Sequence, residues 1–182
     1  MYDHGKFWQT CFAQTTQNGV HLVTLLPEES STTRICVNRS VRLVTHTYLS
    51  QGQKALHPEL EHTGPIVYGL EAISLRFHPR QLYGSRFTIG GNELYDYLKK
   101  QRLLNRCLSL HDGEAIQKKG LAVFEKFFGD QVCILWKSLA HGHRGSRNVP
   151  YLYRDKNSSL VIGWRSLDRH WDNNSPAPHF AV

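Results

Sequence analysis

The sequence predicts an α+β domain with a mainly antiparallel sheet and two central helices. Three observations lead to this class. Short segments with a strand-like pattern occupy both ends of the chain, two segments with a helical period of apolar residues stand between them, and strands and helices do not alternate regularly. A doubly wound parallel sheet requires such alternation, whereas strands followed by helices and again by strands are typical of α+β domains.

The first part of the chain is predicted to form strands. A hairpin is expected over residues 9–26, because Asn18 and Gly19 tolerate the positive φ that a tight turn requires. Further strands are predicted at 32–38, 40–49 and 66–77, the last with a glycine interruption. The loop between the second and third of these holds one short helical turn.

The two helices are predicted at about 92–104 and 112–128. The second begins near Asp112, which can cap free backbone N–H groups, and stops at Gly129. Its apolar residues fall on one side, opposite Lys118, Glu125 and Lys126, as in a helix that packs on a core. We therefore interpret its aromatic residues as core.

The last part of the chain returns to strands. Residues 131–136 read as a buried strand, and residues 149–153 and 159–164 form a predicted hairpin. The final segment, 173–182, is rich in Asn and Pro and is expected to be an irregular tail. The rest, residues 1–172, is expected to be one globular domain, because 182 residues suffice for one sizeable core.

Composition excludes several classes of protein. Hydrophobic residues make up 40% of the chain, which is a globular and not a disordered composition. No stretch approaches the roughly 20 apolar residues of a membrane span, and the N-terminus does not resemble a signal peptide. We expect an intracellular protein, cytoplasmic or, in a eukaryote, nuclear. The four cysteines lack C-x-x-C spacing, and buried free thiols are expected in place of disulfides or a zinc site.

The positive charge is concentrated in one segment. Of the formal net charge of +7, residues 137–171 hold +5, with seven Lys or Arg against two Asp. Clustered positive charge is typical of proteins that bind polyanions, usually nucleic acid. The sequence therefore predicts a module that binds DNA or RNA through this segment.

Both basic and aromatic residues of the segment are candidate contacts. Lys and Arg supply phosphate contacts, and aromatic rings can stack on unpaired bases. The predicted nucleic-acid-binding residues are Lys137, Arg144, Arg147, Tyr151, Tyr153, Arg154, Lys156, Trp164, Arg165, Arg169, His170 and Trp171.

Two alternatives remain open for the same segment. His141 and His143 could act as acid and base in metal-independent RNA or DNA cleavage, because histidine titrates near neutral pH. The basic, aromatic face could instead bind an acidic protein partner within a nucleoprotein assembly. No motif for a cofactor is found, no third ligand accompanies the two histidines, and neither a cofactor nor a bound metal is predicted.

Overall fold

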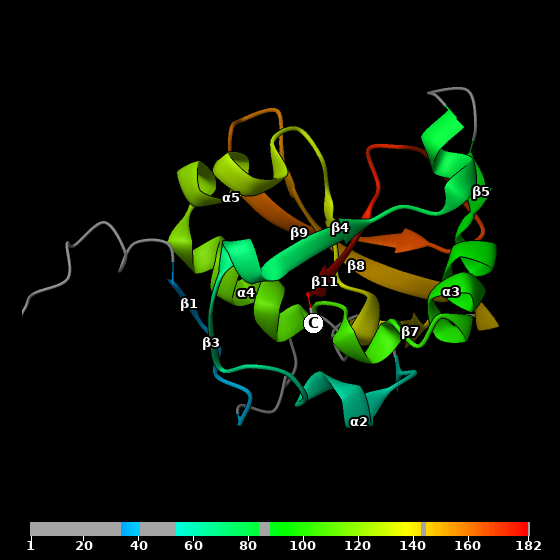
Figure 1. The fold of residues 1–182 in the computed structure, drawn as a ribbon, viewed down its shortest axis with the longest axis horizontal. Coiled ribbons are helices and arrows are strands. Elements are labelled where there is room, and N and C mark those ends of the chain that lie inside the picture. The colour runs from blue at the N-terminus through cyan, green and yellow to red at the C-terminus, as the bar shows by residue number, and fades with distance from the viewer. Residues whose placement is uncertain (1–33, 41–53, 84–87, 143–144, 182) are drawn as a thin grey trace, which may run out of the picture.

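The computed structural model describes residues 34–40, 54–83, 88–142 and 145–181 (Figure 1). It confirms the α+β class, with antiparallel sheets and three substantial helices. The hairpin predicted over residues 9–26 and most of the strand predicted at 40–49 lie outside the described residues.

The largest sheet is built around one long strand, β8 (Arg147–Arg154). The strand β9 (Leu160–Ser166) runs antiparallel along one edge of β8 and forms the predicted hairpin with it. Along the other edge lie β6 (Cys133–Ile134) and β7 (Ala140–His141), and β2 (Lys54–Ala55) pairs with β7. This five-stranded sheet therefore joins segments from distant parts of the sequence.

Three further strand pairs surround the sheet. In each pair the strands run antiparallel: β1 (Arg34–Cys36) pairs with β3 (Val67–Gly69), β5 (Ile89–Gly90) with β10 (His170–Trp171), and β4 (Ile73–Arg76) with β11 (Ala177–Phe180).

The pair β4–β11 corrects the prediction of an irregular tail at 173–182. Only the turn after Trp171 is irregular, and β11 pairs with β4 over its whole length. Pro178 is compatible with this pair, because its carbonyl group points away from β4 and accepts a hydrogen bond from the Leu108 N–H at 3.3 Å, so the N–H that proline lacks is not needed by β4.

The helices differ from the prediction at their ends. α3 (Gly91–Lys100) stops before 104 because Arg102 adopts a positive φ of 55°. The segment predicted as one helix at 112–128 is two, α4 (Leu110–Lys119) and α5 (Leu121–Phe128), separated by Gly120 with a φ of 93°. None of the helices in the described ranges is long and apolar enough to cross a membrane.

The remaining helical elements are short. The predicted turn in the loop before β3 is α2 (Pro58–Glu61). Single 3-10 turns are η1 (Leu70–Ala72), η2 (Pro79–Tyr83), η3 (Leu104–Arg106) and η4 (Trp136–Ser138).

Side chains alternate across β8 and divide the interior into two cores. Leu152 packs into a first core with α4 and α5, whereas Val149 packs into a second core with α3 and Trp171. Figure 1 shows α4 and α5 on the left and α3 on the right. Both faces of β8 therefore pack against a core.

The cysteines of the described residues are free thiols. Cys107 and Cys133 are buried, as predicted, whereas Cys36 is exposed.

One buried carboxylate connects the first core to the segments around it. Asp112 is fully buried and accepts hydrogen bonds from Arg39 Nη2 at 2.7 Å, from Tyr68 Oη at 3.1 Å and from the Ser109 N–H at 2.8 Å. The last bond shows that Ser109 is the N-cap of α4 and Asp112 its third residue, not its cap. The Arg39 side chain also donates to Pro65 O at 2.9 Å.

The junction at Gly120 is testable by substitution. The Gly120→Ala variant is expected to lose about 1–3 kcal/mol of unfolding free energy, because a φ of 93° with a ψ of 173° is accessible almost only to glycine. Urea unfolding measures the loss. Gly90→Ala is the matched control, because Gly90 also faces open space but has a φ of −63°. Equal losses in both variants would show that backbone conformation is not the cause.

The buried ion pair provides a second test. Asp112→Ala is expected to cost about 3–5 kcal/mol of unfolding free energy, because it leaves the buried Arg39 guanidinium without its counter-charge. Glu93→Ala breaks the exposed Arg80–Glu93 pair and should cost less than about 1 kcal/mol. A loss at Asp112 as small as that at Glu93 would contradict the role given to Asp112.

Candidate nucleic-acid interface

The β8–β9 hairpin divides the predicted binding residues between its two faces. Arg147, Tyr151 and Tyr153 project to one face of β8 because they are separated by even numbers of residues, and Arg165 lies on the same face. Trp164 projects to the opposite face and packs against the first core. A single binding surface therefore cannot contain all the residues that the sequence suggested.

Several predicted contacts have structural roles instead. Lys137 is fully buried, its Nζ donates to Thr63 O at 3.0 Å, and burial lowers its pKa. Trp171 is also fully buried, with its ring 5.7 Å from that of Trp136. Arg154 forms ion pairs with Glu125 and Asp130 at the end of α5. Sequence alone does not show that a side chain is buried or already paired with a carboxylate, so it could not separate these three residues from the other basic and aromatic ones.

Other predicted residues remain exposed but are dispersed. Lys156 lies in the turn of the hairpin, and Arg169 and His170 lie at the start of β10. His143 and Arg144 are outside the described residues, so the structure does not test the acid and base pair of His141 and His143. That hypothesis stays a prediction.

A row of three basic side chains crosses the main sheet. Lys54 of β2 is directly opposite His141 of β7, and His141 is directly opposite Arg147 of β8. Directly paired residues project to the same face with Cβ atoms about 4.5–5.5 Å apart. The sheet thus places basic groups from three adjacent strands side by side. We call Lys54, His141 and Arg147 the basic row.

Tyr95 of α3 contacts Arg147, the last residue of the basic row. The Arg147 guanidinium carbon lies 5.3 Å from the centre of the Tyr95 ring, and Lys99 Nζ lies 5.9 Å from it. The Tyr95 hydroxyl is 2.8 Å from His57 Nε2. Burial raises the pKa of Tyr95, while Arg147 opposes this rise, so the hydroxyl stays protonated at neutral pH.

The cations of this region are not neutralised within the described residues. Among the ion pairs of that part of the chain, none includes Lys54, Lys99 or Arg147. The aromatic ring of Tyr95 attracts two of them without removing their charge. Positive charges held close together favour the binding of an anion, because the anion reduces their mutual repulsion.

Sequence reasoning missed Lys54, Lys99 and Tyr95. Lys54 is in a segment interpreted as a loop, and its contact with the basic row depends on strand pairing between residues far apart in sequence. Lys99 and Tyr95 belong to the predicted helix, but no local pattern shows that β8 lies against them. Only the sheet topology brings these residues together.

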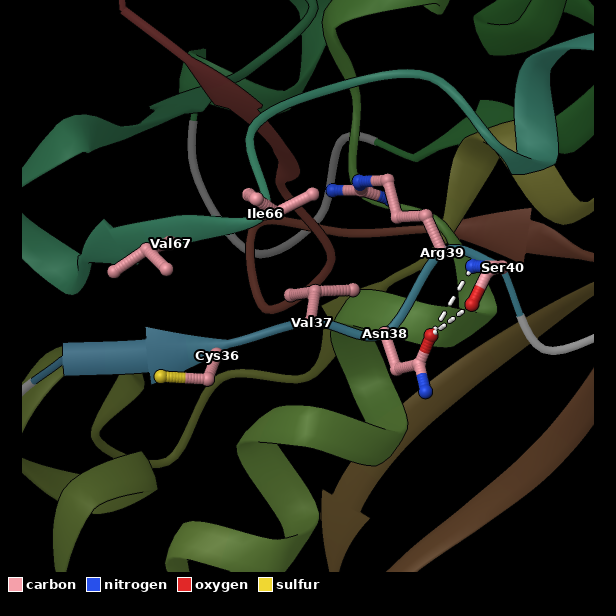
Figure 2. Close-up of a pocket in the computed structure, with 7 residues that line it drawn as sticks. All are labelled: Cys36, Val37, Asn38, Arg39, Ser40, Ile66 and Val67. Carbon is pink, nitrogen blue, oxygen red and sulfur yellow. Dashed lines mark hydrogen bonds between the residues drawn. The ribbon is translucent and has the colours of Figure 1, made fainter.

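One hollow in the described surface lies where the end of β1 meets the start of β3. It has a volume of about 510 Å³ and is lined by Cys36, Val37, Asn38, Arg39, Ser40, Ile66 and Val67 (Figure 2). Its polar groups are occupied, since Asn38 Oδ1 accepts from the Ser40 N–H and hydroxyl, and the Arg39 guanidinium binds Pro65 and Asp112. The hollow therefore offers apolar contact and no convergent catalytic groups.

A smaller cavity of about 150 Å³ lies beside α4, next to this hollow. It is lined by Cys36, Asn38, His111, Glu114, Ala115 and Lys118. His111 is buried, and its Nε2 has no hydrogen-bond partner among the described residues. Burial is the main cause that lowers the pKa of His111 to about 4; the nearby His62 and Arg39 contribute to the decrease, and Asp112 opposes it. The imidazole is therefore neutral at pH 7.

The burial of His111 predicts a loss of stability in acid. The unfolded chain takes up a proton at this residue near pH 6.5, and the folded protein only near pH 4, so acidification between these values favours unfolding. We expect His111→Gln to remove about 3 kcal/mol or less of the decrease in unfolding free energy between pH 7 and pH 4. Urea unfolding at several pH values measures it, and identical pH profiles for the two proteins would refute the assignment.

Within the described ranges, no group of three or more His, Cys, Asp or Glu side chains could hold a metal ion. No protein-family model, no curated protein and no solved structure matches this chain. The basic row and its contacts with Tyr95 are accordingly the features from which a function has to be inferred.

Proposed function

We propose that this protein binds nucleic acid through a basic surface formed by Lys54, Lys99, His141 and Arg147 around Tyr95. The observation that supports it is the register of the basic row, which aligns one basic residue from each of three adjacent strands. The proposal keeps the function expected from the charge of residues 137–171 but changes the residues that perform it. Two of the four basic groups come from outside that segment.

The chemistry of these groups suits a phosphate backbone. Lys and Arg bind phosphate oxygens without reading the base sequence, and Arg presents several N–H donors in a planar fork. Arg147 rests on the Tyr95 ring, which fixes the position of the guanidinium. Basic side chains on adjacent strands, with Cβ atoms about 5 Å apart, suit a polymer with closely and regularly spaced negative charges better than they suit a single small anion.

Salt dependence tests the proposal. We expect labelled DNA or RNA to bind at about 50 mM salt and affinity to fall as salt rises, by about 0.7–0.9 logarithmic units in the association constant per logarithmic unit of salt for each phosphate contact. Lys54→Gln and Arg147→Gln should each weaken binding to all sequences and lower that slope by about 1. Fluorescence anisotropy over a range of salt concentrations measures both quantities.

Arg154→Gln is the matched control, because it also removes one positive charge but from a residue paired with Glu125 and Asp130. It should leave the slope nearly unchanged. If Arg154→Gln lowers the slope as much as Arg147→Gln, binding depends on net charge and not on this surface. If neither DNA nor RNA binds at low salt, the proposal fails.

A further inference from the structure

Two tyrosines form a stacked pair on the same face of β8 as Arg147. The rings of Tyr151 and Tyr153 have centroids 4.9 Å apart and planes inclined by 26°. They are two residues apart on one strand, so both project to the same side of the sheet. The pair therefore presents two nearly parallel aromatic planes in succession.

The inner tyrosine is fixed in place. Tyr151 packs against the second core and lies over Gly163 of β9, where an added Cβ would lie 3.2 Å from two ring carbons and the hydroxyl oxygen of the tyrosine. A larger residue at 163 would displace the ring. Arg165 is close enough to Tyr151 to oppose the rise in its pKa that burial and Tyr153 cause. The absence of a side chain at Gly163 therefore leaves the space that the Tyr151 ring occupies.

The outer tyrosine, unlike Tyr151, does not pack against a core. Tyr153 is half-buried. It lies opposite Val161, and its ring stacks on the ring of Tyr151. Packing into a core therefore does not explain why residue 153 is aromatic. Because the ring is already held in place by Tyr151, it loses little conformational freedom when another ring stacks on it.

We infer that a base of a single-stranded nucleic acid stacks on Tyr153 while the backbone of the same strand contacts the basic row. This inference rests on the function proposed above and names its substrate class. Arg147 and Tyr153 are six residues apart on β8, a separation of about 20 Å, which about six stacked nucleotides span. Arg165 lies on the same face between them. A duplex keeps its bases paired and stacked inside, so it cannot place one on a protein ring.

The test compares single and double strands on variants of Tyr153. Fluorescence anisotropy would be measured with an oligothymidylate of about 12 nucleotides and with a duplex of the same length, near 50 mM salt. Tyr153→Leu keeps an apolar side chain but removes the ring, and we expect it to weaken single-strand binding by about 5- to 150-fold. Tyr153→Phe keeps the ring and should bind as the wild type does. Urea unfolding of each variant confirms that it is folded.

The outcomes separate this inference from the function on which it rests. A single strand that binds more tightly than the duplex, with a loss in Tyr153→Leu that Tyr153→Phe does not show, supports it. Salt-dependent binding that is equal for both forms, or unchanged in Tyr153→Leu, overturns the single-strand inference and leaves the basic surface standing. No binding of either form overturns both. A strand of about three nucleotides is too short to reach both sites and should bind more weakly than the longer one.

Discussion

The buried ion pair between Arg39 and Asp112 is the interaction on which the rest of the structure depends. Removing both charges from water is costly, and it is tolerated here because Asp112 also accepts from Tyr68 and Ser109. Those partners come from the segment after β1, from β3 and from the start of α4. One carboxylate therefore joins the start of α4 to the paired strands β1 and β3 and to the segment that follows β1.

The same region indirectly positions the proposed binding surface. Lys137 donates to Thr63 O, the Ser138 hydroxyl donates to Glu61 at 2.7 Å, and the Leu56 N–H donates to Leu139 O at 2.7 Å. These bonds hold the segment containing α2 against η4, and this segment begins with β2. Lys137 is buried and cannot contact nucleic acid itself, but it helps to position Lys54 beside His141 in the proposed binding surface.

The sequence allowed the fold class and the local elements to be predicted, because period and turn chemistry are local properties. The strand-forming runs at residues 149–153 and 159–164 correctly predicted the hairpin, and Gly129 correctly marked the end of a helix. Gly120 was misread because an apolar period continues across it. No local pattern reveals that Lys137 and Trp171 are buried or that Lys54 pairs with His141. These properties depend on contacts between residues distant in sequence.

The pairing of β4 with β11 has a consequence for how the chain acquires this structure during synthesis. Ile73 leaves the ribosome long before its partner Phe180, and at about 5–20 residues per second the interval is roughly 5–20 s. For that time the edge of β4 has backbone N–H and C=O groups without their final partners, a condition that favours pairing with other chains. A nascent chain of this protein is thus exposed to aggregation over a period that a chaperone could shorten, whatever stability the finished fold attains.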